Sequence, residues 1–361
     1  MRIGIIGAGQ LGQMLGFAAR KLGVECRFVD PSDEPPAAVC GEVIQRPFDD
    51  PDALAELAET CDVITYEFEN VPVEALHEIE GKVPVYPPAD ALRYSQDRLE
   101  EKRIFDRLDI PLPGYRTVDS RSDMAKAVEA LGLPCVVKTR RFGYDGKGQF
   151  VIRERSDIDK AWQTLGGQPL IAEQWVPFDC ELSCIGARNV DGDIVIYPLA
   201  RNVHVGGILH TSCSPVDAPG FADRAETYVR RLLTHLDYVG VLALELFAWE
   251  DDLMANEFAP RVHNSGHWSI EGSATSQFEN HIRAVMNRSL GSTASVGHAG
   301  MVNLIGKIPD AARKLDVGVL HDYGKSPRPG RKLGHITVTA ETADERDRLI
   351  ERISKTVTPS A

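Results

Sequence analysis

The chain has 361 residues and a formal net charge of −13, from 40 lysines and arginines against 53 aspartates and glutamates. Hydrophobic residues make up 43% of the chain and charged residues 26%, which is typical of a globular protein and excludes a disordered, collagen-like or coiled-coil chain. The length allows two or three domains. The acidic balance argues against a protein that binds the backbone of nucleic acids, because such a protein needs a basic face.

The cysteines and the apolar segments bear on cellular location. The seven cysteines include no C-x-x-C pair, so they predict reduced thiols in a cytoplasmic protein and neither disulfides nor a zinc site. Residues 3–19 carry no charge, but glycines and two glutamines interrupt them, which favours a strand and a glycine-rich turn over a signal peptide. No other segment approaches the ~18 consecutive apolar residues of a membrane helix, so we expect no membrane contact.

Short apolar segments alternate with helical patterns in the first part of the chain. Helices are expected at 11–22 and 52–59, and strands at 2–6, 26–29, 43–44, 63–66 and 83–86. This alternation is typical of parallel βαβ units. Residues 1–96 are therefore predicted to form a Rossmann-like α/β domain with an open parallel sheet.

The pattern changes to α+β after residue 96. A charged helix is expected to link the domains, and the following segments are predicted to be strands, hairpins and helices: 97–108 (linking helix), 133–138, 157–165 (helix), 170–174, 181–187 with 193–199, 221–236 (helix), 240–247 with 253–258, and 275–287 (helix). These elements define a central domain, residues 97–290. A linker rich in Gly, Ser and Ala leads into a small C-terminal domain, residues 291–361, with strands at 301–305 and 335–339 and a basic segment at 324–335.

A glycine motif lies near the start of the chain. Residues 7–12 read GAGQLG between a predicted strand and a predicted helix, and Asp30 ends the next strand. Taken alone, this pattern is typical of a dinucleotide site, in which the helix N-terminus meets the pyrophosphate and the acidic residue binds the ribose. The same glycines also suit a tight turn and close helix–sheet packing. The chain has no GxxxxGK[ST] motif, so a P-loop NTPase is not supported.

A second nucleotide site is suggested in the central domain. Lys138 ends an apolar strand, and the loop at 143–149 reads GYDGKGQ. Backbone N–H groups of such a loop can bind phosphates, and a lysine adds positive charge. Residues 173–176 read EQWV, which suits an adenine that needs an apolar slot and backbone hydrogen bonds, and Glu181 could accept from ribose hydroxyls. The alternatives, a strand-edge lysine, a mobile hairpin and a surface carboxylate, remain open at this point.

The hairpin at 240–258 holds two carboxylates. Glu245 lies inside an apolar strand and Glu257 lies in the return strand. If the turn is centred at Asp251, the two residues are directly opposite, with Cβ atoms ~5 Å apart. Two carboxylates at this spacing repel each other unless a cation lies between them, and Mg²⁺ shared with nucleotide phosphates fits. The alternative is that one of them points outward or pairs with a lysine or arginine.

A cluster of donors follows the hairpin. Arg261, His263 and Asn264 stand in the segment APRVHNSGHW at 259–268, and arginine suits bidentate binding of an oxyanion. His263 and His267 are four residues apart, but HNSGH lacks the glutamate of HExxH and contains a glycine, so a zinc peptidase is not supported. An anion site beside a Mg-nucleotide site predicts phosphoryl transfer to an oxyanion.

The order of these features resembles the ATP-grasp superfamily of ligases. The finer motifs are similar to those of the 5-(carboxyamino)imidazole ribonucleotide synthase family of purine biosynthesis: GAGQLGQML, YEFENV at 66–71, GYDGKGQ, NEFAPRVHNSGHW at 256–268 and RPGRKLGH at 328–335. The match runs from residue 7 to residue 335. The chain departs from the wider superfamily at Ala259, where many members carry an asparagine two residues after the second metal glutamate, and Asn256 is the candidate to contribute instead.

The resemblance implies ATP-grasp lobes in the central region, with ATP and Mg²⁺ as cofactors. Glu245 and Glu257 would hold the Mg²⁺. The residues implied to contact ATP are Arg98, Lys138, Gly143, Tyr144, Asp145, Gly146, Lys147, Gly148, Gln149, Glu173, Gln174, Trp175, Val176, Glu181, His204, Asn256 and Glu257.

The resemblance also implies a reaction and an acceptor. The γ-phosphoryl group would pass to bicarbonate, and Arg261, His263 and Asn264 would hold the resulting carboxyphosphate. Asp145 would orient the exocyclic amine of 5-aminoimidazole ribonucleotide, which becomes carboxylated. The residues implied to bind that ribonucleotide are Gln10, Glu69, Lys325, Arg331 and Lys332. Members of the family are typically cytosolic homodimers.

Other functions remain as alternatives. A formate-dependent ATP-grasp ribonucleotide transformylase also uses Mg-ATP and an acyl phosphate, and the HNSGHW segment is the reason to favour bicarbonate. An NAD(P)-dependent dehydrogenase would use the GAGQLG motif but leaves the carboxylate hairpin unexplained. A nucleotide-binding regulatory protein without turnover is opposed by the intact carboxylate pair and the donor cluster.

Overall fold

The computed structural model describes residues 1–143 and 146–357. The chain forms two four-stranded sheets and one nine-stranded sheet. The expected mixture of α/β and α+β architecture is confirmed. None of the described helices is long and apolar enough to cross a membrane.

The N-terminal region has the predicted parallel sheet, with strand order β3-β2-β1-β4. Its elements are β1 (Arg2–Ile6), α1 (Gln10–Lys21), β2 (Glu25–Val29), the 3₁₀ turn η1 (Pro36–Val39), β3 (Gly41–Ile44), α2 (Pro51–Thr60), β4 (Val63–Tyr66), α3 (Val73–Glu80) and α4 (Ala89–Ser95). The strand expected at 83–86 is wrong. Only Val85 pairs with Ile64, as an isolated bridge, because Pro84 within the segment and Pro87 after it lack backbone donors.

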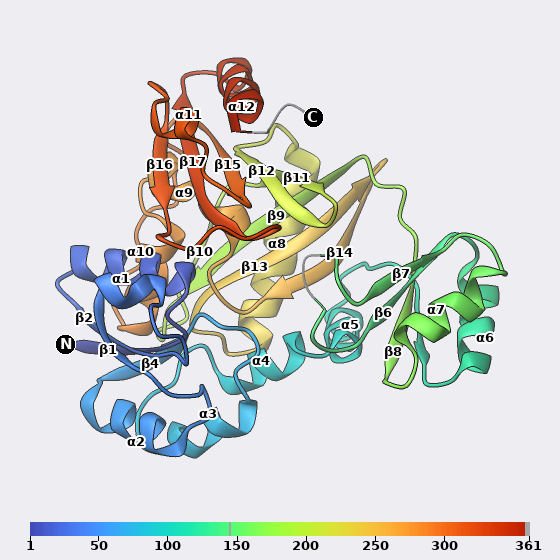
Figure 1. The fold of residues 1–361 in the computed structure, drawn as a ribbon, viewed down its shortest axis with the longest axis horizontal. Helices are drawn as coiled ribbons and strands as arrows, with labels where there is room; N and C mark the ends of the chain where they lie inside the picture. Colours follow the sequence, from blue (N-terminus) through green and yellow to red (C-terminus); the bar gives the residue numbers. More distant parts are fainter. Residues whose placement is uncertain (144–145, 358–361) are drawn as a thin grey trace.

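A small lobe stands apart from the rest of the molecule, on the right of Figure 1. Its elements are β5 (Tyr115–Val118), α6 (Arg121–Leu131), β6 (Cys135–Thr139), β7 (Gln149–Ile152), α7 (Asp157–Leu165) and β8 (Leu170–Gln174). The strands form an antiparallel sheet in the order β5-β8-β6-β7, and the lobe has a hydrophobic core of its own. β5 and α6 were not predicted.

The largest sheet spans the middle and the C-terminal part of the chain. Its order is β14-β13-β9-β11-β12-β15-β17-β16, with β10 paired to β9. The elements are β9 (Cys180–Arg188), β10 (Ile194–Ile196), β11 (Ala200–Val205), β12 (Ile208–Ser214), α8 (Pro219–His235), β13 (Gly240–Trp249), β14 (Asp252–Ala259), η2 (Asn264–Gly266), α9 (Ser269–Gly272), α10 (Gln277–Val285), β15 (His298–Ile305), α11 (Asp310–Arg313), β16 (Val319–Asp322), β17 (Lys332–Ala340) and α12 (Ala343–Val357).

Both predicted hairpins of this region are present, as β9–β10 and β13–β14. β11 and β12 were not predicted, because their residues mix polar and apolar types without clear alternation. The C-terminal strands extend the same sheet, since β15 pairs with β12. Lys332, at the start of β17 and the end of the basic segment, thereby lies beside the residues of β14 that line the same cavities.

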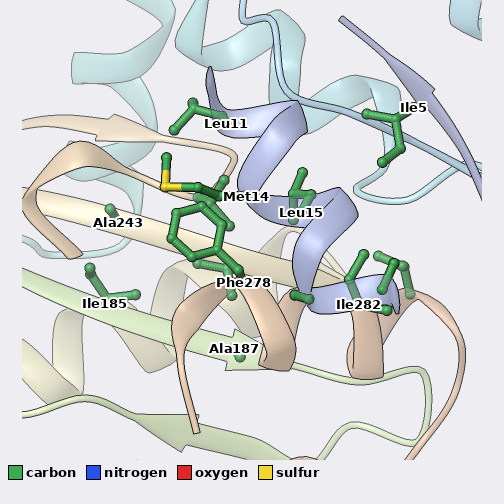
Figure 2. Close-up of a cluster of buried hydrophobic side chains, with 14 of the residues drawn as sticks. Ile5, Leu11, Met14, Leu15, Ile185, Ala187, Ala243, Phe278 and Ile282 are labelled. Carbon is green, nitrogen blue, oxygen red and sulfur yellow. The ribbon is translucent and has the colours of Figure 1, made fainter. Parts of the chain in front are cut away.

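One hydrophobic cluster joins the N-terminal region to the large sheet. Figure 2 shows Leu11, Met14 and Leu15 of α1 facing Phe278 and Ile282 of α10. Small side chains of β9 and β13 lie beneath them, which allows the helices to approach the sheet (Figure 2). Each Å² of apolar surface that is buried in this shared cluster contributes ~25 cal/mol of stability. The cluster therefore stabilises the contact between α1 and the large sheet.

The glycine motif forms the turn between β1 and α1. Gly7 has a φ of +101°, and a Cβ there would lie 2.8 Å from the Glu67 carboxylate. The Gly9 N–H donates to Glu67 Oε1 at 2.7 Å, and the Ala8 N–H donates to Asp30 Oδ2 at 2.8 Å. Two carboxylates of the chain itself therefore occupy the donors that would bind a pyrophosphate in a dinucleotide site.

Helix α5 (Arg98–Arg107) does more than link two domains. β14 is the edge strand of the large sheet, and α5 covers its outer edge. Glu101 accepts a hydrogen bond from the Phe258 N–H at 2.7 Å, and Lys102 donates to the Asn256 carbonyl. The charges on this helix thus satisfy backbone groups that an edge strand leaves unpaired.

We expect Gly7→Ala to lower the free energy of unfolding by about 1–3 kcal/mol, because alanine is strained at this φ and its methyl group meets Glu67. Gly81→Ala is the matched control: Gly81 has a φ of −78° and open space around it, so the change should be neutral or slightly stabilising. Urea unfolding of both variants checks this. Equal effects at the two positions would contradict it.

A second prediction concerns pH. Burial, with the charge of Glu257, raises the pKa of Glu101 to about 8 although Lys102 lowers it. Above the ordinary pKa of a glutamate, the folded protein keeps a proton on Glu101 that the unfolded chain has released. The contribution of this proton to the free energy of unfolding is therefore full at low pH and is lost as the pH rises toward 8. Glu101→Gln keeps the acceptor for Phe258 and does not ionise.

Urea denaturation of the parent protein and of the Glu101→Gln variant at pH 5, 7 and 9 measures how the free energy of unfolding changes with pH. The variant should gain stability relative to the parent as the pH rises. A difference that does not change with pH would contradict the assignment.

Candidate active site

Two cavities of about 290 Å³ each lie side by side in the molecule. The first lies between the small lobe and the large sheet, and the second lies between the large sheet and the N-terminal region. Five residues line both cavities: Arg98, Glu257, His263, Asn264 and Lys332. They form a shared wall, so a group held in one cavity is close to a group held in the other.

The inner end of the first cavity carries an ion pair. Lys138 Nζ lies 2.8 Å from Glu173 Oε2, and Lys102 Nζ lies 3.7 Å from the same oxygen. Burial alone would raise the pKa of Glu173, but the two lysines outweigh it and lower the pKa to about 2. The carboxylate is therefore ionised at neutral pH. Lys102 was not predicted as a site residue, because nothing in the sequence distinguishes it from the other charged residues of its helix.

The outer part of the first cavity is apolar. The segment EQWV borders it as expected, and the other apolar lining residues come from several strands: Val136, Val151, Leu209 and Phe247. Phe178 stacks on Phe247 with ring centroids 4.8 Å apart. An apolar slot beside exposed backbone of β8 is what an adenine ring requires.

Glu181 and His204 lie between the apolar slot and the shared wall. His204 Nδ1 lies 2.8 Å from Glu181 Oε2. Burial lowers the pKa of His204, but the hydrogen bond to Glu181 and the charge of Glu245 outweigh burial and raise it. Both residues were predicted, and the structure brings them together on β9 and β11.

The two predicted carboxylates of the hairpin are directly opposite each other, as expected: Glu245 pairs with Glu257. The reason differs from the expected one. Trp249 pairs with Asp252, so the centre of the turn precedes the assumed position, and an unbroken hairpin would set Glu245 against Asn256. A β-bulge restores the pairing of the glutamates, with Asn256 as the extra residue. Lys102 binds the carbonyl of that residue.

Each carboxylate has one cationic or polar neighbour. Arg98 donates to Glu257 Oε2 at 2.8 Å, and His263 Nε2 lies 3.5 Å from Glu245 Oε1. Burial and the charge of Glu257 raise the pKa of Glu245, whereas Arg98 outweighs burial and lowers the pKa of Glu257. The two carboxylates are thus unequal: Glu257 ionises readily, whereas ionising Glu245 costs free energy.

The second cavity is polar. Gln10 and Glu69 line it together with Arg261, whose Nη2 lies 2.5 Å from Glu69 Oε2. Burial strongly lowers the pKa of His263, with a further contribution from Arg261, so its imidazole is neutral at pH 7. The cavity therefore offers four cationic side chains, one neutral imidazole and the Asn264 amide; the cations are Arg98, Arg140, Arg261 and Lys332.

The basic segment reaches the edge of the second cavity. Lys325 Nζ donates to Gln10 Oε1 at 2.9 Å. Burial, with the positive charge of Arg331, lowers the pKa of Lys325 to about 8. Arg331 and Lys325 line neither cavity, whereas Lys332 lines both. Arg328 belongs to the same group of charges and was not predicted.

The glycine-rich loop lies at the junction of the two cavities. Gly146, Lys147 and Gln149 line the first cavity and Gly143 lines the second. Tyr144 and Asp145, both predicted site residues, lie outside the described residues. Gly148 has a φ of +72°, and a Cβ there would lie 2.7 Å from the Thr139 hydroxyl, so the loop needs glycine at this position.

The sequence analysis missed several residues of the second cavity: Ser95, Gln96, Glu101, Arg140 and Phe142. Gln96 Nε2 donates to the carbonyls of Glu69 and Val71, which fixes the segment that carries Glu69. Polar side chains beside a predicted interdomain helix were the only available signal. That signal does not separate binding residues from a solvated surface.

The donor set can be tested for a metal ion. No group of three or more His, Cys, Asp or Glu residues suited to a metal occurs in the described part of the chain. Two opposed carboxylates beside a nucleotide cavity still fit Mg²⁺, because this ion takes one or two protein carboxylates and completes its shell with phosphate oxygens and water. A cation at this position would offset the burial and the repulsion that raise the pKa of Glu245.

Three family models match the chain in succession. The ribonucleotide synthetase preATP-grasp domain matches residues 1–96, the ATP-grasp domain matches residues 103–278, and the phosphoribosylaminoimidazole carboxylase C-terminal domain matches residues 299–349. The matched ranges follow one another in the order of the three domains expected from the sequence.

Individual proteins match over nearly the full length. The N5-carboxyaminoimidazole ribonucleotide synthase of Pseudomonas aeruginosa is 48% identical, over 94% of each chain, and that of Bacillus subtilis is 40% identical, over 95% of this chain and 92% of the relative. The crystal structure of N5-carboxyaminoimidazole ribonucleotide synthetase from Thermus thermophilus superposes with a TM-score of 0.94 at 47% identity, covering 99% of both chains.

A further structure is informative because of its ligands. N5-carboxyaminoimidazole synthase from Aspergillus clavatus, in complex with ADP and 5-aminoimidazole ribonucleotide, superposes with a TM-score of 0.91 at 32% identity, over 99% of this chain and 98% of that one. Identity of this extent over whole chains, with three domain models in the same order, establishes that the chain belongs to the N5-carboxyaminoimidazole ribonucleotide synthase family.

Proposed function

We propose that the protein carboxylates the exocyclic amine of 5-aminoimidazole ribonucleotide, using ATP and bicarbonate, in de novo purine biosynthesis. The observation that carries this proposal is the shared wall: a nucleotide-shaped cavity and a polar cavity meet at Glu257, Arg98 and His263. Such an arrangement suits transfer of a phosphoryl group from a nucleotide to an anion in the neighbouring cavity. Membership of the family supports the identity of both substrates.

ATP would occupy the first cavity. Its adenine fits the apolar slot beside residues 173–176, with Lys138 and Glu173 at the inner end, and Glu181 is placed for the ribose hydroxyls. The phosphates would lie against Arg98, His204 and the described glycine-loop residues Gly143, Gly146, Lys147, Gly148 and Gln149. We extend the proposal to Tyr144 and Asp145 because they belong to the same loop.

Glu245 and Glu257 would hold Mg²⁺ with Asn256 nearby, and the ion, when bound, neutralises charge on the nucleotide phosphates. Arg98 has a separate task. Its guanidinium neutralises Glu257 through the hydrogen bond given above. Arg98 also lies on the shared wall, where the oxygens of the transferring phosphoryl group would develop charge. An arginine there stabilises the transferring group without moving, which is the main contribution that proteins make to this reaction.

The chemistry balances with these residues. An oxygen of bicarbonate attacks the γ-phosphorus, the bond to the β,γ-bridging oxygen breaks, and ADP leaves, giving carboxyphosphate. Its C–O bond then breaks to release CO₂ and phosphate. Arg261, His263 and Asn264 would hold the anion, and neutral His263 donates or accepts a hydrogen bond without adding charge. Holding the anion at the wall between the two cavities limits its contact with water, in which carboxyphosphate is labile.

The ribonucleotide would occupy the second cavity. Its amine nitrogen attacks the CO₂ carbon, a C–N bond forms as one C=O π bond opens, and the nitrogen loses one proton to the phosphate released with the CO₂. Asp145 is proposed to orient this amine. Gln10 and Glu69 would contact the ribonucleotide, and Lys325, Arg331 and Lys332 would bind its 5′-phosphate. The depressed pKa of Lys325 supports this role, because mutual repulsion of the cations would be relieved by a bound dianion.

The remaining expectations are also part of the proposal. Residues 1–96, 97–290 and 291–361 are proposed as the three domains, and the ranges of the family models support this division. We propose a cytoplasmic homodimer from the family resemblance. A dehydrogenase is disfavoured, because the Ala8 and Gly9 N–H groups are already bonded to Asp30 and Glu67.

The proposal is tested by measuring ADP release from Mg-ATP with bicarbonate, with and without 5-aminoimidazole ribonucleotide. Release should rise strongly only when both are present, and ¹³C-bicarbonate should give a labelled carbamate by NMR. Formate in place of bicarbonate should not support release. Release that ignores the ribonucleotide would leave the ATP site standing and reject the proposed acceptor.

We expect Glu257→Gln to reduce kcat by about 100-fold or more, because the shared wall loses the charge that holds a cation beside the phosphates. Asp252→Asn is the matched control, an exposed carboxylate on the same strand, and should stay within about twofold of the parent. Steady-state assays of ADP formation compare them. Near-normal turnover by a folded Glu257→Gln protein would reject the metal assignment.

A further inference from the structure

We infer that Asn303 is a positioning residue for the reaction. It fixes the direction of the Asn264 side-chain amide, so that an N–H of Asn264 is available to the anion at the shared wall. This inference rests on the proposed function, because it assigns Asn264 to bicarbonate or carboxyphosphate. Asn303 itself lines neither cavity, so it acts only through Asn264.

The two asparagines form a reciprocal amide pair. Asn264 Nδ2 donates to Asn303 Oδ1 at 3.2 Å, and Asn303 Nδ2 donates to Asn264 Oδ1 at 2.7 Å. Asn303 Nδ2 also donates to the Leu209 carbonyl at 2.8 Å. Asn303 is 3% exposed, so water does not compete for these bonds.

The Leu209 carbonyl decides the orientation of the whole chain of bonds. A backbone carbonyl only accepts, so the amide nitrogen of Asn303 must face it, and both hydrogens of that nitrogen are then used. The Asn303 oxygen consequently faces Asn264 and accepts from its nitrogen. A reversed Asn264 amide would place oxygen against oxygen and nitrogen against nitrogen.

This orientation leaves Asn264 with donor capacity toward the anion. Beyond Asn303, the nitrogen of Asn264 contacts the sulfur of Met301 at 3.8 Å, and a thioether is a weak acceptor. An anionic oxygen forms a much stronger bond with such a donor. The oxygen of Asn264, which would repel an anion, is turned toward Asn303.

The Asn303 amide satisfies the Leu209 carbonyl and the Asn264 amide, so its contribution is to hold these groups and not to bury apolar surface. Asn303 lies within β15, between buried Val302 and Leu304, in the middle of the large sheet. A leucine there would bury more apolar surface without the cost of desolvating an amide, but it would leave the Leu209 carbonyl and the Asn264 amide without this partner. The amide is explained by what it holds, namely the segment that carries Asn264 at the junction of the two cavities.

Asn303→Leu tests the inference through the Michaelis constants. Loss of the orienting bonds should raise the KM for bicarbonate about tenfold, while the KM for ATP stays within about twofold because the adenine end of the site is untouched. In a double-mutant cycle, Asn264→Leu with Asn303→Leu should be no worse than Asn264→Leu alone. Asn189→Leu is the control, a buried asparagine bonded to Asp193 in a distant hairpin, and should leave both constants unchanged.

The outcomes are distinguishable. An unchanged KM for bicarbonate in folded Asn303→Leu protein would overturn the inference, as would effects of the two substitutions that add. If Asn303→Leu does not fold, Asn303→Asp serves instead, since a carboxylate cannot donate to the Leu209 carbonyl or to the Asn264 oxygen, and both bonds that fix the orientation of the Asn264 amide are then lost. It should raise the same KM, and parent-like kinetics would overturn the inference. ADP release by the parent protein that does not depend on bicarbonate would reject the proposed function itself.

Discussion

The site depends on two partly buried carboxylates that face each other across one hairpin. Glu245 and Glu257 stand opposite in the β13–β14 ladder, where desolvation and mutual repulsion both oppose ionisation. A fold tolerates such a pair when positive charge is supplied nearby. Arg98 supplies it to Glu257 from α5, and the proposed Mg²⁺ would supply it between the two, which explains why the nucleotide cavity and the anion cavity meet at this point.

The surroundings of this pair show how much the sequence could predict. Counting residues in the hairpin gave the correct pairing of the glutamates although the assumed turn was displaced, because the bulge at Asn256 compensated for the error. Alternation of short apolar segments with helical patterns predicted the parallel sheet, whose inner strands are buried on both faces, and turn residues between apolar segments predicted both hairpins. Many polar side chains of the first cavity were predicted because they share a strand or a loop with a recognisable motif, whereas apolar lining residues such as Val136, Phe178 and Leu209 were not predicted.

Other parts of the site could not be predicted, for a common reason. Lys102, Gln96 and Asn303 act through bonds to residues far away in the sequence, and no local period marks such contacts. The GAGQLG turn shows the converse. Its local pattern fits a dinucleotide site, yet Glu67 and Asp30 occupy its donors. Tertiary contacts decide which of two functions a short motif can serve.

The central claim is that a phosphoryl group passes across the shared wall from ATP to bicarbonate. Turnover with ¹⁸O-labelled bicarbonate tests it directly, by mass spectrometry of the inorganic phosphate. Attack by a bicarbonate oxygen on the γ-phosphorus, followed by C–O cleavage, predicts one ¹⁸O atom in the phosphate for each ADP formed. Phosphate that carries no label, from a reaction that still carboxylates the amine, would contradict the account.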